Sequence, residues 1–144
     1  MKEFHISDIL SITTGRLVST RGMQGIYDIL NYLTGDNLFT HQLPRASEEC
    51  EPYLKRNYPK LFPDYPAMKS LLRDLDDSID SCDGSREELV ERVDRWVGLV
   101  MKVLKLPEYM GLLPLSKGEH EDKDPVDELE EMIGRHRLVI VERN

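Results

Sequence analysis

The sequence lacks the features that mark several large classes of protein. It has only two cysteines, Cys50 and Cys82, which form neither a CxxC pair nor a disulfide framework. It has no run of about 18 apolar residues, and no apolar segment follows the start Met1–Phe4 as it would in a secretory signal. We therefore expect a cytoplasmic protein with reduced thiols that neither spans nor binds a membrane.

The motifs of the common catalytic and cofactor-binding classes are also missing. The sequence contains no GxxxxGK[ST], no GxGxxG, no HExxH, no GxSxG and no EF-hand loop. Its four histidines, His5, His41, His120 and His136, are scattered without the spacing of metal ligands. We therefore expect no cofactor and no bound metal, we assign no catalytic residue, and we favour a non-enzymatic protein over an enzyme.

Negative charge is present in excess, but only in the later part of the chain. The net charge is −8; residues 1–60 hold seven basic and seven acidic residues, whereas residues 61–144 hold twelve basic and twenty acidic ones. Because nucleic acids are held by Lys and Arg, we expect no direct nucleic-acid partner. The acidity is typical of a solvated face that keeps a protein soluble. The sharper alternative is a surface offered to a basic partner protein, for which the candidates are Asp74, Asp76, Asp77 and Asp80.

Apolar residues recur at helical spacing along most of the chain. The expected helices cover approximately residues 7–14, 23–34, 44–57, 68–79, 85–106 and 125–134, with a kink or break at Pro52. Residues 108–124 are expected to form a loop. The best strand candidate is Leu138–Val141, which would pair with Phe4–Ile6 or Leu17–Ser19.

These elements predict a mainly α (α+β) fold. About five to six helices would pack in one domain, residues 1–144, with a small two- or three-stranded sheet near the termini. The turn at Cys82–Gly84 divides this domain into a part that begins neutral, residues 1–82, and an acidic helical part, residues 83–144.

Two segments end a helix with Thr-Gly and then present polar side chains at a backbone break. They are Ile12–Leu17 and Thr34–Arg45. Ordinary helix caps and turns account for such residues, and this interpretation is favoured; the alternatives are a protein- or ligand-binding site and, less favoured, a catalytic one. The candidate binding residues are Thr14, Arg16, Asp36, Asn37, Thr40, His41 and Arg45.

Two apolar stretches offer another route to a partner. Aromatic, Met and Leu residues crowd into Pro52–Met68 and into Tyr109–Leu115. Such side chains on irregular backbone can anchor an interface. We favour the alternative, in which they cover helix ends as part of the core.

The two Thr-Gly segments also carry a resemblance. The stretches 9–17, 27–36 and 39–45 resemble a family of small, uncharacterised proteins encoded by phages and prophages, over about residues 1–58. The family has no activity or site residue to carry over. What the resemblance implies is an accessory phage protein that acts in the cytosol of a bacterial host.

The leading hypothesis is therefore a phage accessory protein without enzymatic activity. It would bind, and modulate or inhibit, a host or phage protein with a basic surface, for example a defence complex, in the manner of an anti-CRISPR protein. Specificity would come from Asp36–Arg45 or Tyr58–Met68, and a homodimer is a further option. The alternatives are a small-ligand binder or enzyme that uses Thr14, Arg16, Asp36 and His41, and a virion assembly protein.

Overall fold

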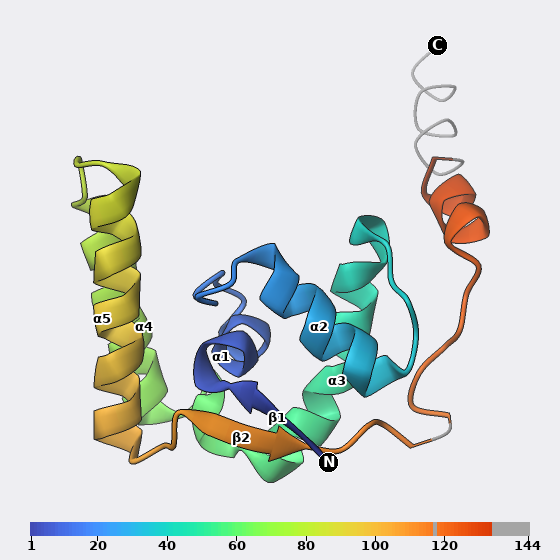
Figure 1. The fold of residues 1–144 in the computed structure, drawn as a ribbon, viewed down its shortest axis with the longest axis horizontal. Helices are drawn as coiled ribbons and strands as arrows, with labels where there is room; N and C mark the ends of the chain where they lie inside the picture. Colours follow the sequence, from blue (N-terminus) through green and yellow to red (C-terminus); the bar gives the residue numbers. More distant parts are fainter. Residues whose placement is uncertain (117, 134–144) are drawn as a thin grey trace.

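Helices make up most of the computed structural model, which describes residues 1–116 and 118–133 (Figure 1). The element order is β1 (Lys2–His5), α1 (Ile6–Thr14), α2 (Met23–Thr34), η1 (Thr40–Gln42), α3 (Leu43–Asn57), η2 (Pro59–Leu61), α4 (Pro66–Asp80), α5 (Arg86–Leu104) and β2 (Tyr109–Leu112). Residues 125–133 form a further helical segment. The predicted fold class, mainly α with a small sheet, is confirmed.

The sheet joins the start of the chain to the segment that follows α5. β1 and β2 are antiparallel, with Phe4 opposite Met110 and Glu3 opposite Gly111. The expectation of a loop across 108–124 is therefore wrong for residues 109–112. Four residues are too few to show a strand period, and their partner strand lies at the other end of the sequence. The strand expected at Leu138–Val141 lies outside the described residues.

The core is built around α1, which contacts α2, α3, β1 and η2. Its side chains Ile6, Ile9 and Leu10 are fully buried. The helix begins where His5 Nδ1 accepts the Ser7 backbone N–H at 3.1 Å. It ends at a left-handed glycine, as the sequence predicts for a Thr-Gly ending. α1 is therefore the central helix of the core, and the first Thr-Gly segment continues from its end.

α3 is a single helix that continues through Pro52. The break expected at this proline does not occur. Proline removes only one backbone donor, and the buried side chains Ala46, Cys50 and Leu54 hold both halves of the helix against the core.

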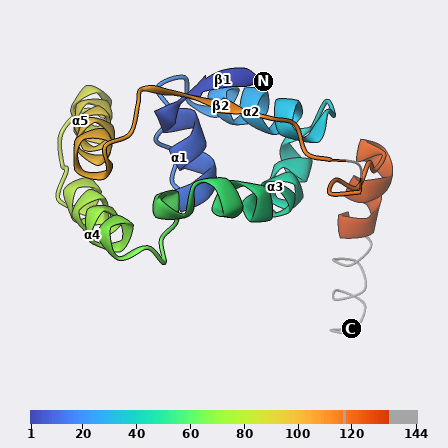
Figure 2. The ribbon, with the colours of Figure 1, turned by 90° about the horizontal axis from the view of Figure 1, so that it is seen from below.

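α4 and α5 pack on each other and stand at one side of the molecule (Figures 1 and 2). The indole Nε1–H of Trp96 donates to the carbonyl oxygen of Leu71 at 2.7 Å, which fixes the two helices together. Ser85 caps the start of α5, because its Oγ accepts the Glu88 backbone N–H at 3.2 Å. This pair of helices, residues 66–104, is called the hairpin arm below.

The chain after β2 crosses to the opposite side of the molecule, where residues 125–133 lie (Figures 1 and 2). On the way, the Leu115 backbone N–H donates to the carbonyl oxygen of Leu33 at 2.8 Å. Among the described residues, none of the helices combines the length and apolar character that crossing a membrane requires.

Candidate functional site

The first Thr-Gly segment uses its polar groups to hold the fold. The Thr14 hydroxyl is buried and donates to the carbonyl oxygen of Leu10 at 2.6 Å. Arg16 forms a two-pronged ion pair with Asp76 on α4, with Nη2 to Oδ2 at 2.7 Å and Nε to Oδ1 at 3.3 Å. Arg16 and Asp76 were predicted to belong to different surfaces, and the structure pairs them with each other. They fasten the end of α1 to the hairpin arm.

The second Thr-Gly segment lies against a later part of the same chain. We call this set of contacts the polar clasp. On one side are Asp36, His41, Gln42, Arg45 and Glu49; on the other are His120, Glu121, Lys123, Pro125 and Glu128. Three of the predicted binding residues therefore bind residues 120–128 of their own chain.

His120 lies at the centre of the polar clasp, with its side chain 9% exposed. Its Nε2 lies 3.0 Å from Asp36 Oδ2, and its Nδ1 lies 2.7 Å from Glu49 Oε1. Burial opposes protonation, but the hydrogen bonds to both carboxylates outweigh it and raise the pKa of His120 above its usual value. The geometry is that of an imidazolium donating to two carboxylates.

Arg45 makes the strongest anchor of the polar clasp. Its Nε donates to Glu128 Oε1 at 2.8 Å and its Nη2 to Glu128 Oε2 at 3.1 Å, while Gln42 Nε2 donates to the same carboxylate at 2.8 Å. The hydrogen bonds from Arg45, helped by Gln42, lower the pKa of Glu128 to about 2. A charge-assisted, two-pronged contact of this kind fixes orientation as well as position. It holds residues 125–133 on the start of α3.

The remaining two candidates do not join a common site. Thr40 hydrogen-bonds to the hydroxyl of Tyr27 on α2. Asn37 is exposed, and its backbone N–H donates to Asp36 Oδ1 at 2.7 Å. His41 Nε2 lies 2.8 Å from the carbonyl oxygen of Pro125. Five of the seven candidates are thus divided between the Arg16–Asp76 pair, the polar clasp and the Tyr27–Thr40 contact, whereas Thr14 bonds to its own helix and Asn37 is exposed.

One group in the polar clasp has the composition of a cation site. Ligand atoms of Asp36, His120 and Asp122 lie within 4.8 Å of one another. A metal requires an unprotonated imidazole nitrogen, whereas both nitrogens of His120 face carboxylates that favour its protonated form. Ion pairing accounts for this group, and we assign no metal to it.

The two Thr-Gly segments do meet, but at an apolar groove. The groove encloses about 330 Å³ between α1, α2 and the start of α3. Its lining residues are Ser11, Ile12, Gly15, Leu17, Met23, Ile26, Leu30, Thr40, Leu43, Pro44 and Ser47. None of these described residues carries an ionisable side chain, and Leu17 and Met23 on its margin are 55% and 44% exposed. We call it the Thr-Gly groove.

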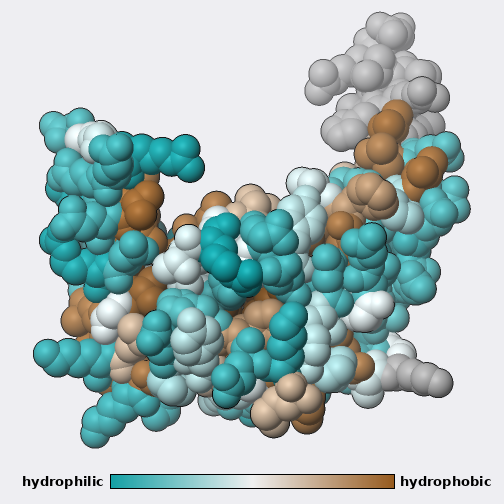
Figure 3. Space-filling view, in the orientation of Figure 1, coloured by the Kyte–Doolittle hydropathy of each residue, from teal (hydrophilic) through white to brown (hydrophobic). Residues whose placement is uncertain are grey.

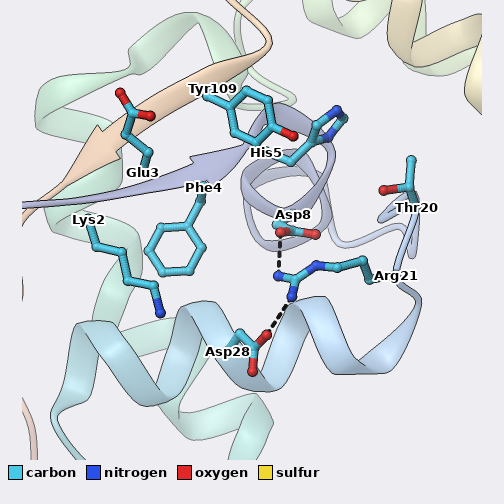
Figure 4. A pocket seen from close by; sticks show the side chains of 9 residues that line it. All are labelled: Lys2, Glu3, Phe4, His5, Asp8, Thr20, Arg21, Asp28 and Tyr109. Carbon is cyan, nitrogen blue, oxygen red and sulfur yellow. Dashed lines mark hydrogen bonds and ion pairs between the residues drawn. The ribbon is translucent and has the colours of Figure 1, made fainter.

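A second, polar pocket of about 230 Å³ lies beside β1 (Figure 4). The Asp8 carboxylate is buried there and pairs with Arg21 at 2.8 Å, and Arg21 also pairs with Asp28 at 2.5 Å. A Cβ at Gly25 would collide with Asp8 and with Ser19, so the close approach of α1 and α2 requires this glycine. The ion pairs of Arg21 with Asp8 and Asp28 thus join α1 to α2.

Cys50 lies in an environment that disfavours a nucleophilic thiolate. Cys50 is buried in α3, and burial raises the pKa of its thiol to about 12. Cys82 is partly exposed beside the turn that ends α4, and both are free thiols. A catalytic cysteine needs the opposite environment, one that favours the thiolate.

The predicted acidic residues of α4 occupy two faces. Asp74 lines a groove with Arg92, Arg95 and Lys102 of α5. Asp77 lies on the other side of the helix, in a pocket with Arg73 and the Arg16–Asp76 pair. The acidic residues on α4 are therefore interleaved with basic ones.

Sequence reasoning did not single out the Thr-Gly groove as an apolar surface. The available signals were Leu17, in the connector after α1, and Met23, at the start of α2; both are large apolar residues close to the polar groups of the connector. The polar side chains identified the two Thr-Gly segments. The surface that these segments share, the Thr-Gly groove, is formed by their apolar side chains.

The fold and its contacts thus define a small helical protein with an apolar groove, in which Arg16, Asp36 and Arg45 of the predicted binding segments pair with other residues of the same chain. Residues 4–70 match the model of a family described as a domain of unknown function, DUF7736. The match extends from β1 to the first turns of α4 and includes the entire Thr-Gly groove. In agreement with the resemblance found over residues 1–58, this family is uncharacterised. Neither the curated proteins nor the solved structures gave a match.

Proposed function

We propose that the protein acts by binding another protein, without catalysing a reaction, and that the Thr-Gly groove receives apolar side chains of that partner. The single observation that carries the proposal is the lining of the groove. A catalytic site needs positioned acids, bases or nucleophiles, and none of the described lining residues is ionisable. Apolar side chains gathered in a concave surface are typical of the centre of an interface.

The context of this binding comes from the resemblance to phage and prophage proteins. We extend the proposal accordingly: the partner is a host or phage protein in the bacterial cytosol, and binding blocks its activity, as an anti-defence or anti-CRISPR-like inhibitor does. The net charge of −8 suits a partner with a basic surface and disfavours direct contact with nucleic acid.

No observation favours the enzymatic or small-ligand alternative. It requires Thr14, Arg16, Asp36 and His41 to act together, whereas Arg16 pairs with Asp76 and Asp36 pairs with His120. The virion-assembly alternative predicts that the protein is recovered in purified phage particles. The hypothesis of a cytosolic inhibitor does not predict this.

The proposal is tested by affinity capture of the tagged protein from phage-infected cells, with mass spectrometry of what is retained. We expect one host or phage protein to be enriched by the wild type and lost with Leu17→Asp or Met23→Asp, because a buried, unpaired carboxylate opposes docking.

The matched control is Leu113→Asp. Leu113 is 50% exposed, close to the 55% of Leu17, but does not line the Thr-Gly groove. This variant should retain the partner. Equal capture by all three variants, or no specific partner for the wild type, would contradict the proposal.

A further inference from the structure

Two surfaces at opposite sides of the molecule combine exposed apolar side chains with charges of opposite sign. One is a groove of about 460 Å³ on the hairpin arm, between α4 and α5. The other is the exposed face of residues 125–133. Figure 3 shows apolar side chains both on the hairpin arm and on the opposite side of the molecule.

The groove on the hairpin arm has an apolar floor and a mainly basic rim. Leu75, Trp96 and Leu99 form the floor, and Leu99 is 42% exposed. Val103, one turn further along α5, is 49% exposed and extends the apolar strip. The charged residues that line the groove are Arg92, Arg95, Lys102 and Asp74.

Two of the three basic groups on the rim are available to a partner, whereas Arg92 pairs with Glu88 at 3.0 Å and donates to the carbonyl oxygen of Ser78. Among the residues that the structure describes, Arg95 pairs only with Glu91 of its own helix, at 3.2 Å, and both side chains are about 70% exposed. An exposed pair of this kind is weak. Lys102 is exposed and makes no ion pair with the described residues. A basic rim on a protein with an overall charge of −8 favours an acidic occupant.

Gly98 opens the groove at its middle. It lies inside α5, where glycine costs about 0.5–1 kcal/mol relative to alanine. A Cβ at this position would meet no atom within 4 Å, so packing within the described part of the chain does not require the glycine. Its missing side chain leaves room for a neighbouring helix to approach closely.

Residues 125–133 have the matching chemistry. Val126, Leu129, Met132 and Ile133 are 62%, 41%, 42% and 42% exposed. The spacing places all four on one side of the helix. The exposed acidic residues Asp127, Glu130 and Glu131 occupy the rest of its surface. This is an acidic amphipathic helix whose apolar side is uncovered among the described residues.

We propose that the helix at residues 125–133 of one copy docks in the α4–α5 groove of a second copy. Within one chain the two surfaces lie on opposite sides of the molecule (Figures 1 and 2), because the Arg45–Glu128 contact holds residues 125–133 on α3. Contact therefore requires another molecule. Reciprocal closure of two such contacts gives a dimer, and an amphipathic helix in an apolar groove is a common mode of recognition.

The test is sedimentation velocity over a range of concentration, from about 1 µM to about 1 mM. The wild type should associate into a dimer, more weakly at high salt because the paired charges are exposed. The groove variant Arg95→Glu/Lys102→Glu and the helix variant Asp127→Lys/Glu130→Lys should each be monomeric, or dimerise about tenfold or more weakly.

An equimolar mixture of the two reversed variants supplies the decisive result. In each mixed contact an acidic groove meets a basic helix, or a basic groove an acidic helix, so the mixture should recover the dimer. The control pair Arg86→Glu and Glu51→Lys reverses exposed charges outside both surfaces and should dimerise like the wild type. Circular dichroism checks that every variant is folded.

A wild type that stays monomeric overturns the proposal. The occupant of the α4–α5 groove would then be an acidic segment of another protein. A mixture that stays monomeric also overturns it, as does unchanged association of both reversed variants. The result is independent of the Thr-Gly groove, since Leu17→Asp changes neither surface and should leave the dimer intact.

Discussion

At the scale of single residues, the charged side chains that matter most for the fold are those that pair with distant residues of the same chain. Arg16 and Asp76 are 60 positions apart, and Asp36 and His120 are 84 apart. Three of these four, Arg16, Asp36 and Asp76, were candidates for binding a partner or ligand. A charged group that is partly buried needs a partner of opposite charge, and pairing within the chain supplies it. The apolar residues of the Thr-Gly groove then remain as the surface that can contact another protein.

The polar clasp should respond to pH through His120. The pKa of its imidazole is raised by Asp36 and Glu49. The stabilisation of the clasp by the protonated form is therefore complete below the usual histidine pKa of about 6.5. It is lost as the pH rises through the higher value of the folded state. We expect proteolysis within residues 113–124 to quicken as the pH rises above about 6.5, beyond the change in protease activity on an unfolded peptide.

His120→Gln is the matched variant for that measurement. Glutamine keeps a hydrogen-bonding side chain but cannot carry the charge, so this step in the proteolysis profile should disappear. The account of His120 is wrong if the variant keeps the same pH profile as the wild type. Glu128, with a pKa of about 2, stays ionised across this range and does not contribute to the step.

At the scale of elements, local signals in the sequence were sufficient to predict where several helices begin and end. The glycines after Thr14 and Thr34 end α1 and α2 in the left-handed conformation, and Ser85 caps α5. These signals act within one turn of helix, so a single sequence contains them. β2 could not be found in this way, because its pairing with β1 depends on the packing of everything between them.

Gly98 provides a test of whether α5 is shaped for docking or only for stability. Gly98→Ala should raise the free energy of unfolding by about 0.5–1 kcal/mol, because alanine favours the helix and its Cβ enters open space. The same methyl group should weaken the self-association proposed above. Thermal or denaturant unfolding measures the first effect and sedimentation the second.

A destabilised Gly98→Ala variant would show that a contact within the molecule requires the glycine. Unchanged association would show that no second helix approaches α5 at this point. Gly25→Ala is the contrasting variant, since its Cβ would collide with Asp8 and Ser19. It should destabilise the fold.

At the scale of the whole molecule, the candidate site was only partly predictable. The sequence identified the two segments that form the Thr-Gly groove, because their Thr-Gly endings and polar residues are unusual. It did not show that Arg45 and Asp36 contact residues 120–128, or that Leu17 and Met23 share a surface. Those facts depend on how α1, α2 and α3 pack, which no local pattern encodes.

The acidity of the chain predicts how the proposed partner is attracted. Asp77 and Asp80 are exposed on α4 and make no ion pair with the described residues, whereas Asp76 pairs with Arg16. Reversing Asp77 and Asp80 to Lys should therefore weaken binding of the captured partner and reduce its salt dependence, without disturbing the fold.

Asp76→Lys is a poor test by comparison, because it also breaks the tie between α1 and the hairpin arm. An affinity that is unchanged by the Asp77 and Asp80 reversals at low salt would remove the electrostatic part of the proposal. The apolar contact at the Thr-Gly groove would then account for binding by itself.

The central claim is that the Thr-Gly groove is covered by a partner protein, and site-specific photo-crosslinking tests it most directly. A photoreactive amino acid replaces Leu17, Met23 or, as the control, Leu113, and cells are irradiated during phage infection. The account predicts one and the same protein adduct at positions 17 and 23 and none at 113. It is contradicted if neither groove position yields an adduct, or if all three positions yield the same ones.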